Sequence, residues 1–580
     1  MNAGDGSGDQ TAMTLRGRAL DWAWAHPRWK KRAREVWATG RGVARRLHLG
    51  RLLEPEEFRD LRRLAATATP PLDGGPRLLI LSFRGWSTHL SIEAVLGHTV
   101  VGRGWVPVFV TCGGRLPVCD VMPVQAAPPM PCRSCSEYAT GAIGAAGFDV
   151  VKLRDIVEMR SVSADARRRV ADLSSVDECG RFAASGLPLG RLVRTSVAWF
   201  LSRGTLTEDP VVLRTYRSFL VSGLVLAEAF DRILDRVRPD RLLVLNGRFF
   251  AEAIITAMAS QRGLGWTAYE RGFRPDTIVA TPDAPACDLI IPEDGARRAL
   301  ERPLTAAEDG ELEAYLSERR DGQGTFDKLW TVRIEDPGMI RSQLTLTDAR
   351  PLVVMFPNIL WDSAVVGMDL GFASVGDWVV GGIRWARTHP ELDLVVRLHP
   401  AEVRLTNHPT VERMSDHIRR EVPALPPNVR IVAPESPISS YSLIDAARVG
   451  LVYTSTVGLE MAARGIPVVV GARTHYRGLG FTIDPTTPDE YWAAVDRLVG
   501  STVPGEVDRM TRSLARRYAH AFFFSFHRRL GGVHEEGHSR PRVLVRSAAD
   551  LEAGRDPSLD LIVSDVLGTA PRFATRRAGA

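Results

Sequence analysis

The sequence predicts an α/β protein in which two domains are each built around a parallel sheet. The clearest sign is a strand–helix–strand unit over residues 449–471, where two short apolar runs flank a helix-like segment from Val457 to Arg464. Parallel neighbouring strands require a crossover of this kind. Similar apolar runs begin at Arg77 and at Pro351, and a chain of 580 residues is too long for one core. We therefore expect two α/β domains.

The first part of the chain, residues 1–74, is expected to be a basic helical arm. Between Arg16 and Arg51, eleven Lys or Arg face two acidic residues, which gives this stretch a net charge of +9 against +6 for the whole chain. Four tryptophans lie among these cations: Trp22, Trp24, Trp29 and Trp37. Basic helices that carry tryptophan bind anionic membrane surfaces. The alternative is a helix that packs its tryptophan face on the rest of the protein.

The rest of the chain excludes several classes of protein. Outside the stretch from Arg16 to Arg51 the net charge is about −3, whereas a nucleic-acid-binding domain would itself be basic, so no nucleic-acid partner is expected. No apolar run approaches the ~20 residues that span a bilayer, and no apolar segment follows the polar N-terminus. The expected location is the cytoplasm, peripheral at the inner face of the plasma membrane if the arm binds lipid.

The six cysteines are expected to be free thiols, because cytosolic proteins rarely form disulfides. They are Cys112, Cys119, Cys132, Cys135, Cys179 and Cys287. Cys132 and Cys135 form a C-x-x-C pair, and a four-cysteine zinc site with the two upstream residues is conceivable. However, six residues separate Cys112 from Cys119, which fits such a site poorly. We therefore expect no bound metal, and thiols that pack an irregular loop.

The first α/β domain is expected over residues 75–295. Buried-strand runs occur at 77–82, 106–111, 241–246 and 265–270, and the stretch 140–235 is mostly helical. Asn246 ends the third run with Arg248 just beyond it, and Glu270 ends the fourth. Because the carboxyl ends of parallel strands share one edge of a sheet, we expect these three side chains to face a common cleft.

A helical connector over residues 296–349 is expected to lead to the second α/β domain at 350–505. Strand runs at 351–356, 394–398 and 429–433 precede the unit at 449–471. Pro400 stops the second of these runs, so His399 should lie at the carboxyl tip of a strand, where open α/β sheets bind ligands. A long helix over 506–530 and a loosely packed tail over 531–580 are expected to follow.

Hydroxyl side chains occupy the turn between strand and helix in the unit at 449–471. They belong to Thr454, Ser455 and Thr456. Such hydroxyls either cap the helix or, with the unpaired N–H groups of its first turn, bind phosphate. Asn358, after the run at 351–356, either faces the cleft or shapes a loop.

Three motifs of the second domain occur together in this order. They are Arg397-Leu-His399-Pro400, then Ser455-Thr-Val-Gly-Leu-Glu460 followed by Gly465-Ile-Pro467-Val468, and His475-Tyr476-Arg477-Gly478-Leu-Gly480-Phe-Thr482. These motifs resemble the capsular polysaccharide biosynthesis family of GT-B glycosyltransferases, which includes the bacterial Kdo transferases. The first two are also similar to those of the bacterial sialyltransferases that use CMP-sugars. The resemblance covers Pro351–Asp484 well and Leu78–Arg529 loosely.

The resemblance implies a GT-B-like fold, with two Rossmann-like domains facing a cleft and the helix at 506–530 returning to the first domain. It also implies a glycosyltransferase without cofactor or metal. This enzyme would move a sugar from a nucleotide-sugar to a growing capsule or surface polysaccharide, or to a lipid-linked acceptor. The motif pair favours a CMP-linked donor, with UDP- and GDP-sugars as alternatives.

The resemblance also assigns roles to individual residues. Glu270 would be the catalytic base, with Glu293 as the alternative, and His399 would act on the leaving phosphate. The nucleotide-sugar would be bound by Arg397, Pro400, Ser439, Ser440, Thr454, Ser455, Thr456, Gly458 and Glu460. The cleft would be lined by Asn246, Arg248, Asn358, Tyr476, Arg477 and Gly478.

Two other functions stay open at this point. A UDP-sugar 2-epimerase-like enzyme would share the twin-domain fold, but such enzymes carry a Gly-Gly and paired acids where this chain has Val457-Gly458-Leu459-Glu460. The other possibility is a non-catalytic scaffold of a capsule assembly or export complex, which would bind no nucleotide.

Overall fold

The structure is a computed structural model that describes residues 54–71, 74–123, 130–322, 335–347, 349–405, 408–500, 509–536 and 540–569. The chain divides into two compact units, Met1–Glu56 and Glu57–Ala580, and the second contains both large sheets. The basic stretch with its four tryptophans lies outside the described residues.

The first sheet has seven strands in the order β12-β6-β5-β4-β1-β2-β3. They are β1 (Arg77–Leu81), β2 (Val106–Thr111), β3 (Val150–Lys152), β4 (Arg241–Leu245), β5 (Gly265–Arg271), β6 (Thr277–Pro282) and β12 (Arg528–Arg529). Strands β1 to β5 are parallel, whereas β6 runs antiparallel to β5 and β12 antiparallel to β6. The chain therefore returns, near its end, to complete the edge of its first sheet.

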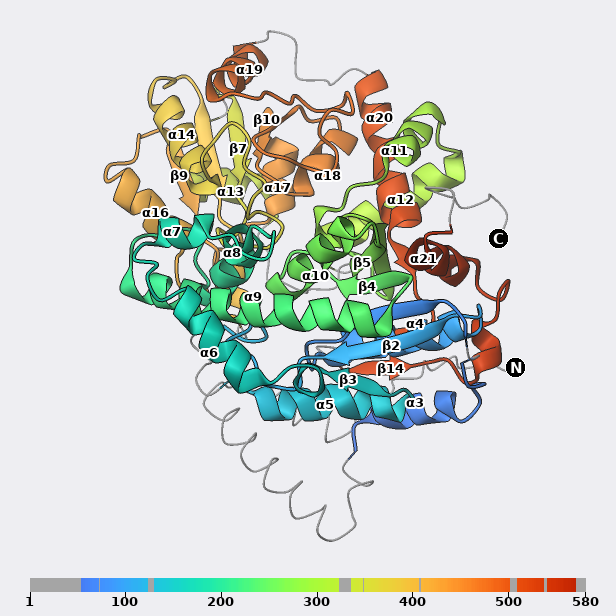
Figure 1. Ribbon diagram of the computed structural model, residues 1–580. Helices are drawn as coiled ribbons and strands as arrows, with labels where there is room; N and C mark the ends of the chain where they lie inside the picture. Colours follow the sequence, from blue (N-terminus) through green and yellow to red (C-terminus); the bar gives the residue numbers. More distant parts are fainter. Residues whose placement is uncertain are drawn as a thin grey trace, which may run out of the picture. The chain divides into compact units, whose positions relative to one another are not determined.

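The second sheet has five parallel strands in the order β11-β10-β7-β8-β9. They are β7 (Leu352–Phe356), β8 (Asp393–Arg397), β9 (Val429–Val432), β10 (Val449–Val452) and β11 (Val468–Val470). In both sheets the parallel strands follow the order 3-2-1-4-5, which is the doubly wound arrangement. The expectation of two Rossmann-like α/β domains is confirmed, and Figure 1 shows the two sheets in separate parts of the protein.

Helices flank both sheets. Those of the first domain are α4 (Ser87–Val101), α5 (Cys132–Ala145), α6 (Met159–Arg169), α7 (Val176–Arg181), α8 (Leu189–Leu201), α9 (Pro210–Val237) and α10 (Phe250–Gln261), with α3 (Glu56–Ala65) before them. Those of the second are α14 (Val375–Arg387), α15 (Ala401–Arg404), α16 (Met414–Glu421), α17 (Ser440–Ala446), α18 (Val457–Ala463) and α19 (Pro488–Gly500). The connector contains α11 (Glu293–Glu301), α12 (Ala306–Arg320) and α13 (Pro337–Leu344).

Within the described part of the chain, α9 is the one helix long and apolar enough to span a membrane. Its residues Phe219, Leu220 and Val225 are fully buried, and the helix packs against α6, α8 and α10. Burial of this kind is that of a central core helix, which explains its apolar composition.

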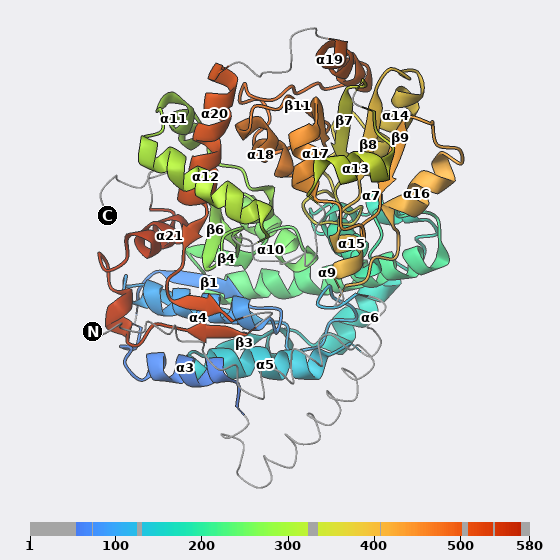
Figure 2. The same cartoon turned by 180° about the vertical axis from the view of Figure 1, so that it is seen from behind.

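The predicted return helix is α20 (Arg509–His520), which continues as a π-helical segment over Ala521–Phe526. Helix α20 lies beside α11, α12 and α18, as both Figure 1 and Figure 2 show. The segment then enters β12, so it leads from the second domain to the first sheet.

The expectation of a loosely packed tail over 531–580 is wrong for its described part. Strands β13 (Val533–Glu535) and β14 (Pro541–Val543) pair, and α21 (Pro557–Leu567) packs on the first sheet. Ile562 and Val566 of α21 are fully buried, and the Thr267 hydroxyl donates to the Asp565 carbonyl (2.9 Å). The apolar residues of α21 form only a short run among Gly, Pro and charged residues, so composition did not predict a packed helix here.

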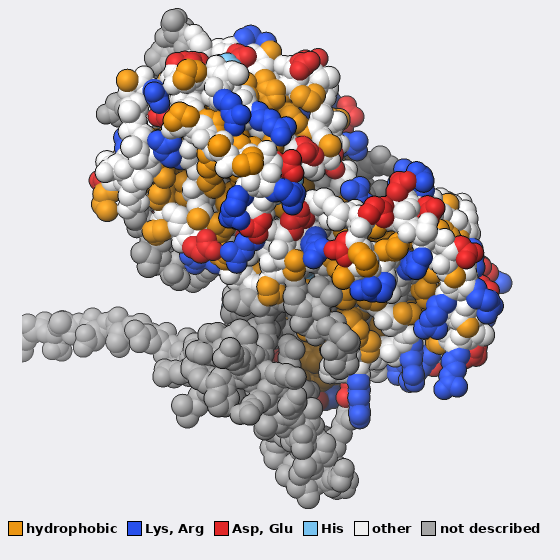
Figure 3. Space-filling model, turned by 90° about the vertical axis from the view of Figure 1, so that its left-hand side faces the viewer, with side chains coloured by type: hydrophobic (Ala, Val, Ile, Leu, Met, Phe, Trp, Pro, Cys, Tyr) orange, Lys and Arg blue, Asp and Glu red, His pale blue; other side chains and the backbone are white. Residues whose placement is uncertain are grey.

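Charges on the surface are mixed in sign. On the face shown in Figure 3, Lys and Arg side chains alternate with Asp and Glu over the described residues. The described residues also include exposed pairs within a helix, such as Arg232 with Glu228 (2.6 Å), and pairs of this kind contribute little to stability.

Candidate functional site

A pocket of about 380 Å³ lies at the carboxyl ends of three strands of the second sheet. Phe356 and Pro357 follow β7, His399 and Pro400 follow β8, and Ser455 and Thr456 follow β10. The order of the strands reverses between β7 and β10, and doubly wound sheets bind ligands at this switch point. Residues 270–273, at the end of β5, and Arg319 of α12 also line the pocket.

Eight of the residues predicted for the site line this pocket. They are Glu270, Arg397, His399, Pro400, Ser440, Ser455, Thr456 and Glu460. An imidazole and two hydroxyls that are far apart in sequence therefore share one cavity with a carboxylate from the other domain. The alternative base, Glu293, begins α11 and lines a separate pocket of about 550 Å³.

His399 is neutral at physiological pH. Burial, helped by the charge of Arg397, lowers the pKa of the imidazole to about 4. Its Nδ1 atom accepts a hydrogen bond from the backbone N–H of Ala401 (3.2 Å), which places the ring proton on Nε2. His399 can therefore donate a hydrogen bond from Nε2, but it is a poor source of a whole proton.

The two hydroxyls differ in their local role. The Ser455 Oγ accepts from the backbone N–H of Val457 (3.3 Å), a local turn that leaves its O–H free to point at a ligand. Thr456 precedes α18 and makes no side-chain capping bond. Both groups are thus positioned as donors at the floor of the pocket.

Glu270 is held by two donors. Its Oε2 accepts from the Asn246 amide (3.1 Å) and its Oε1 from the backbone N–H of Arg271 (2.9 Å). Asn246 adopts a left-handed backbone conformation (φ +58°), and its Oδ1 accepts from the backbone N–H of Arg248 (2.9 Å). Asn246 was predicted to line the cleft, but the structure places it behind Glu270, where it orients the carboxylate.

Glu460 was predicted to bind ligand, yet its carboxylate already has protein partners. Oε1 accepts from Arg319 (Nη2 2.8 Å, Nε 3.1 Å) and Oε2 from the Tyr441 hydroxyl (2.8 Å). The glutamate is fully buried. Its first role is therefore to hold Arg319 and Tyr441 in the wall of the pocket.

Arg397 lines the pocket, but its guanidinium supports a loop. Nη1 donates to the carbonyl of Ala433 (2.5 Å) and Nη2 to that of Ser436 (3.3 Å), just after β9. Burial lowers the pKa of the guanidinium to about 10. Arg397 therefore holds the loop after β9 while it lines the pocket, and its charge helps to keep His399 neutral.

Gly458, Tyr476, Thr454 and Asn358 lie behind the pocket, although all were predicted to face it. A Cβ on Gly458 would lie 2.3 Å from the Tyr476 hydroxyl, so no side chain fits there. That hydroxyl donates to the Ser455 carbonyl (2.6 Å), and the Thr454 N–H donates to Asn358 Oδ1 (3.2 Å). These residues fix the loop that carries Ser455.

The other predicted residues lie away from the pocket: Arg248, Arg477, Gly478 and Ser439. Arg248 pairs with Asp288 (Nε to Oδ1 2.7 Å). Arg477 donates to the carbonyl of Asp484 (2.6 Å), and the N–H of Gly478 donates to the carboxylate of the same aspartate (2.8 Å). Ser439 is buried just before α17. Arg477 and Gly478 line the pocket of about 550 Å³ that also contains Glu293.

Arg319 is a pocket residue that the sequence analysis missed. Arg319 lies in a charged helical stretch, Ser-Glu-Arg-Arg, whose pattern is that of a solvated helix. Its side chain is only 9% exposed, and its guanidinium lies over the rings of Phe273 and Phe523. That Arg319 belongs to the pocket could be recognised only from its tertiary contacts.

The fold and the pocket together define a GT-B-like protein, with two Rossmann-like domains and a cleft whose lining residues come from both. No protein-family model and no curated protein matches the sequence. Among solved structures, the beta Kdo 2,4 transferase KpsC of Thermosulfurimonas dismutans is similar over 54% of this chain and 87% of its own, with 15% identity and a TM-score of 0.35.

Two further structures have comparable likeness. The UDP-GlcNAc 2-epimerase of Neisseria meningitidis is similar over 76% of this chain and 95% of its own (12% identity, TM-score 0.22). The glycosyltransferase SnogD of Streptomyces nogalater is similar over 77% and 95% (14% identity, TM-score 0.22). At these TM-scores the likenesses do not bear on the activity.

Proposed function

We propose that the protein is a glycosyltransferase that takes a sugar from a nucleotide-sugar donor. The observation that carries this proposal is that His399, Ser455 and Thr456 line the same pocket as Glu270, which comes from the other domain. Three arginines and two glutamates line the same pocket, so its formal charge favours an anionic ligand such as a phosphate.

The residues divide the reaction between them. The bond between the anomeric carbon and the donor phosphate breaks, and the charge that develops on the phosphate is stabilised by the Nε2–H of His399 and by the two hydroxyls. Each such donor is worth about 3 kcal/mol in the transition state. Glu270 takes the proton of the acceptor hydroxyl as the new glycosidic bond forms. No metal ion is required in this scheme.

The finer parts of the proposal rest on the sequence motifs and on the basic arm. The first is that the donor is a CMP-linked sugar, and the second is that the acceptor is a capsule or other surface polysaccharide, or a lipid-linked precursor. The third is that the protein lies at the inner face of the plasma membrane. The His-Pro and Ser-Thr motifs favour the first two. The cationic stretch with its tryptophans favours the third.

The decisive experiment has two stages. A thermal-shift screen with CMP, CDP, UDP, GDP and their sugars identifies the nucleotide, and product analysis of the stabilising sugar nucleotide follows, with and without acceptor. Transfer to an acceptor with release of nucleotide supports the proposal. An epimerised sugar nucleotide formed without acceptor would assign the epimerase reaction instead, and absence of nucleotide binding would leave a scaffold.

A further inference from the structure

Four of the six cysteines gather where β2 ends and α5 begins. Cys112 and Cys119 lie in the loop after β2, Cys132 is the first residue of α5, and Cys135 follows one helical turn later. None of these residues belongs to the pocket described above.

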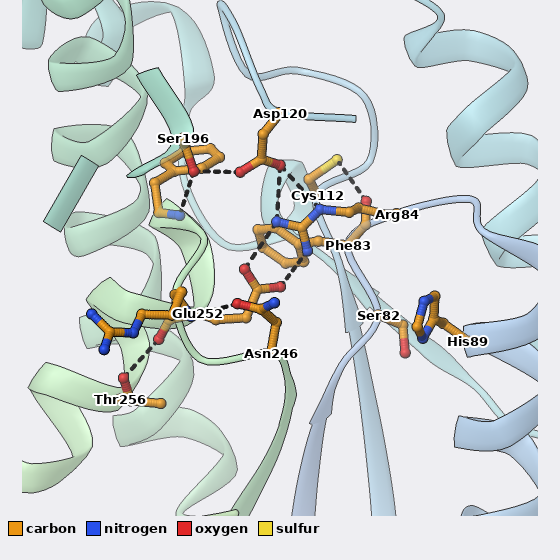
Figure 4. Close-up of polar contacts among 12 residues, drawn as sticks. Ser82, Phe83, Arg84, His89, Cys112, Asp120, Ser196, Asn246, Glu252 and Thr256 are labelled. Carbon is orange, nitrogen blue, oxygen red and sulfur yellow. Dashed lines mark hydrogen bonds and ion pairs between the residues drawn. The ribbon is translucent and has the colours of Figure 1, made fainter. Parts of the chain in front are cut away.

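The segment from Phe83 to Gly85, just after β1, touches sulfurs from both pairs. The N–H of Gly85 donates to Cys135 Sγ (3.1 Å), and Cys112 Sγ lies 3.9 Å from the Phe83 carbonyl oxygen. Figure 4 shows the latter contact beside the buried ion pairs of Arg84 with Asp120 and Glu252. The loop after β2 and the start of α5 are therefore docked on the same turn.

The loop after β2 also touches Cys132 directly. A Cβ on Gly114 would lie 2.9 Å from the carbonyl oxygen of Cys132 and 3.3 Å from its Cβ, so only glycine allows this approach. Gly113 and Gly114 both have positive φ (+65° and +73°), and their turn folds the six-residue spacer back. The long spacing between Cys112 and Cys119, which argued against a zinc site, is accommodated by this turn.

Backbone N–H groups point at three of the four sulfurs. Besides Gly85, the N–H of Gly114 donates to Cys112 Sγ (3.4 Å) and that of Val121 donates to Cys119. Thiols are weak acceptors, whereas thiolates are strong ones, so three such donors in one place favour the metal-bound, deprotonated form.

The four sulfurs also interact electrostatically. Burial and the nearby sulfurs of Cys135 and Cys132 raise the pKa of Cys112 to about 11, and burial with nearby Asp120, Cys112 and Cys135 raises the pKa of Cys119 well above its ordinary value. A divalent ion would remove this repulsion, and the charge of Arg84 favours the thiolates of Cys112 and Cys135.

We propose that Cys112, Cys119, Cys132 and Cys135 bind one thiophilic metal ion, Zn²⁺ being the ion best suited to four thiolates. Four S–H protons are released to solvent as four metal–sulfur bonds form, with no change of oxidation state. Over the described residues, no group of three or more His, Cys, Asp and Glu side chains is arranged to hold a metal ion, so the four sulfurs do not form a preassembled site in this structure. The ion would then tie the loop after β2 to α5.

The test is metal analysis of the full-length protein purified without added metal. We expect about one zinc per chain by elemental mass spectrometry, and its loss in each of Cys112→Ser, Cys119→Ser, Cys132→Ser and Cys135→Ser. Cys179→Ala and Cys287→Ala, which lie outside the cluster, should keep it. Iron with acid-labile sulfide, lost in the same four variants, would support the four-thiolate site but assign it an iron–sulfur cluster.

A second measurement keeps the test informative if a variant fails to fold. Wild-type protein stripped by chelator is titrated with Co²⁺, and four-thiolate binding gives intense sulfur-to-cobalt charge-transfer and tetrahedral ligand-field bands. Wild-type protein without bound metal and without these bands would overturn the proposal. So would a disulfide between two of the four cysteines, found by differential alkylation of protein isolated under reducing conditions.

Discussion

The Nη2 atom of Arg319 lies 2.8 Å from Oε1 of Glu460, and this buried ion pair joins the helical connector to the second domain. Both side chains are almost completely enclosed. A buried pair of this kind adds little net stability compared with apolar residues, but loss of one partner leaves an uncompensated charge. Arg319 also lies over Phe273 of the first domain and Phe523 of the return segment, so the pair helps to set the walls of the pocket.

Arg319→Met should destabilise the protein by about 3–5 kcal/mol, because Glu460 then lies buried with only the Tyr441 hydroxyl as partner. The double variant Arg319→Met, Glu460→Met should recover most of this loss, since no charge is left unpaired. Calorimetric melting of the three proteins measures both effects. Equal melting temperatures for wild type and the single variant would show that the pair is solvated.

Glu270→Gln should lower the rate of sugar transfer at least ~100-fold while nucleotide binding is kept. The reason is that an amide cannot take up the proton of the acceptor hydroxyl. Glu293→Gln is the matched control, since Glu293 lies outside the pocket. Initial rates and thermal shifts with nucleotide separate the two effects. A large rate loss in the Glu293 variant alone would transfer the role of base to that residue.

His399→Ala should lower the rate of transfer ~100-fold or more, the loss expected for one donor to the transition state, with the fold retained. His399→Gln should keep part of the rate, because its amide N–H can replace the Nε2 donor. The comparison of kcat for the two variants checks the role of His399 as a donor. Near-wild-type activity of a well-folded His399→Ala protein would remove His399 from the reaction.

The protein should lose stability as the pH falls from about 6.5 to about 4. The His408 ring packs at a tilt against those of Trp199 and Trp361, and burial lowers the pKa of its imidazole to about 4. The unfolded chain takes up this proton near pH 6.5, so between these values it binds more protons than the folded protein, and acid favours unfolding.

Between pH 7 and pH 5, the protonation of His408 in the unfolded chain should lower the free energy of unfolding by about 2 kcal/mol. His408→Gln, which can still donate to the Trp199 carbonyl, should therefore show a smaller fall in Tm over this range. His534→Gln is the control, because that side chain is 43% exposed. If wild type, His408→Gln and His534→Gln all show the same fall in Tm, the loss of stability in acid comes from groups other than His408.

Deletion of residues 1–50 should abolish sedimentation with anionic liposomes, because the deletion removes ten of the eleven cations counted between Arg16 and Arg51. Sedimentation is compared with neutral liposomes and at raised salt, which screens the attraction. If the truncated protein sediments as well as the full chain does, the arm has another role.

The parts of the fold and site that could be predicted are those encoded in a local pattern. Apolar runs between turn residues gave the strands, and Pro400 placed His399 at a strand tip beside the Ser455 turn. Arg319 could not be found in this way, because its surroundings in the sequence are those of a solvated helix. Gly458 was correctly marked as special but lies behind the pocket, since sequence cannot distinguish a residue that supports a loop from one that faces a ligand.

The pairing of β12 with β6 has a consequence for how the protein is made. Arg528 and Arg529, more than 240 residues after Pro282, close an edge that the first domain leaves open, and Arg528 is also paired with Asp565 of α21. During synthesis, β6 can pair with β5 at once, but its outer edge must stay unpaired while the whole second domain is translated. An amino-terminal fragment that stops before the return segment should therefore aggregate, and co-expression of the missing carboxyl-terminal piece should rescue it.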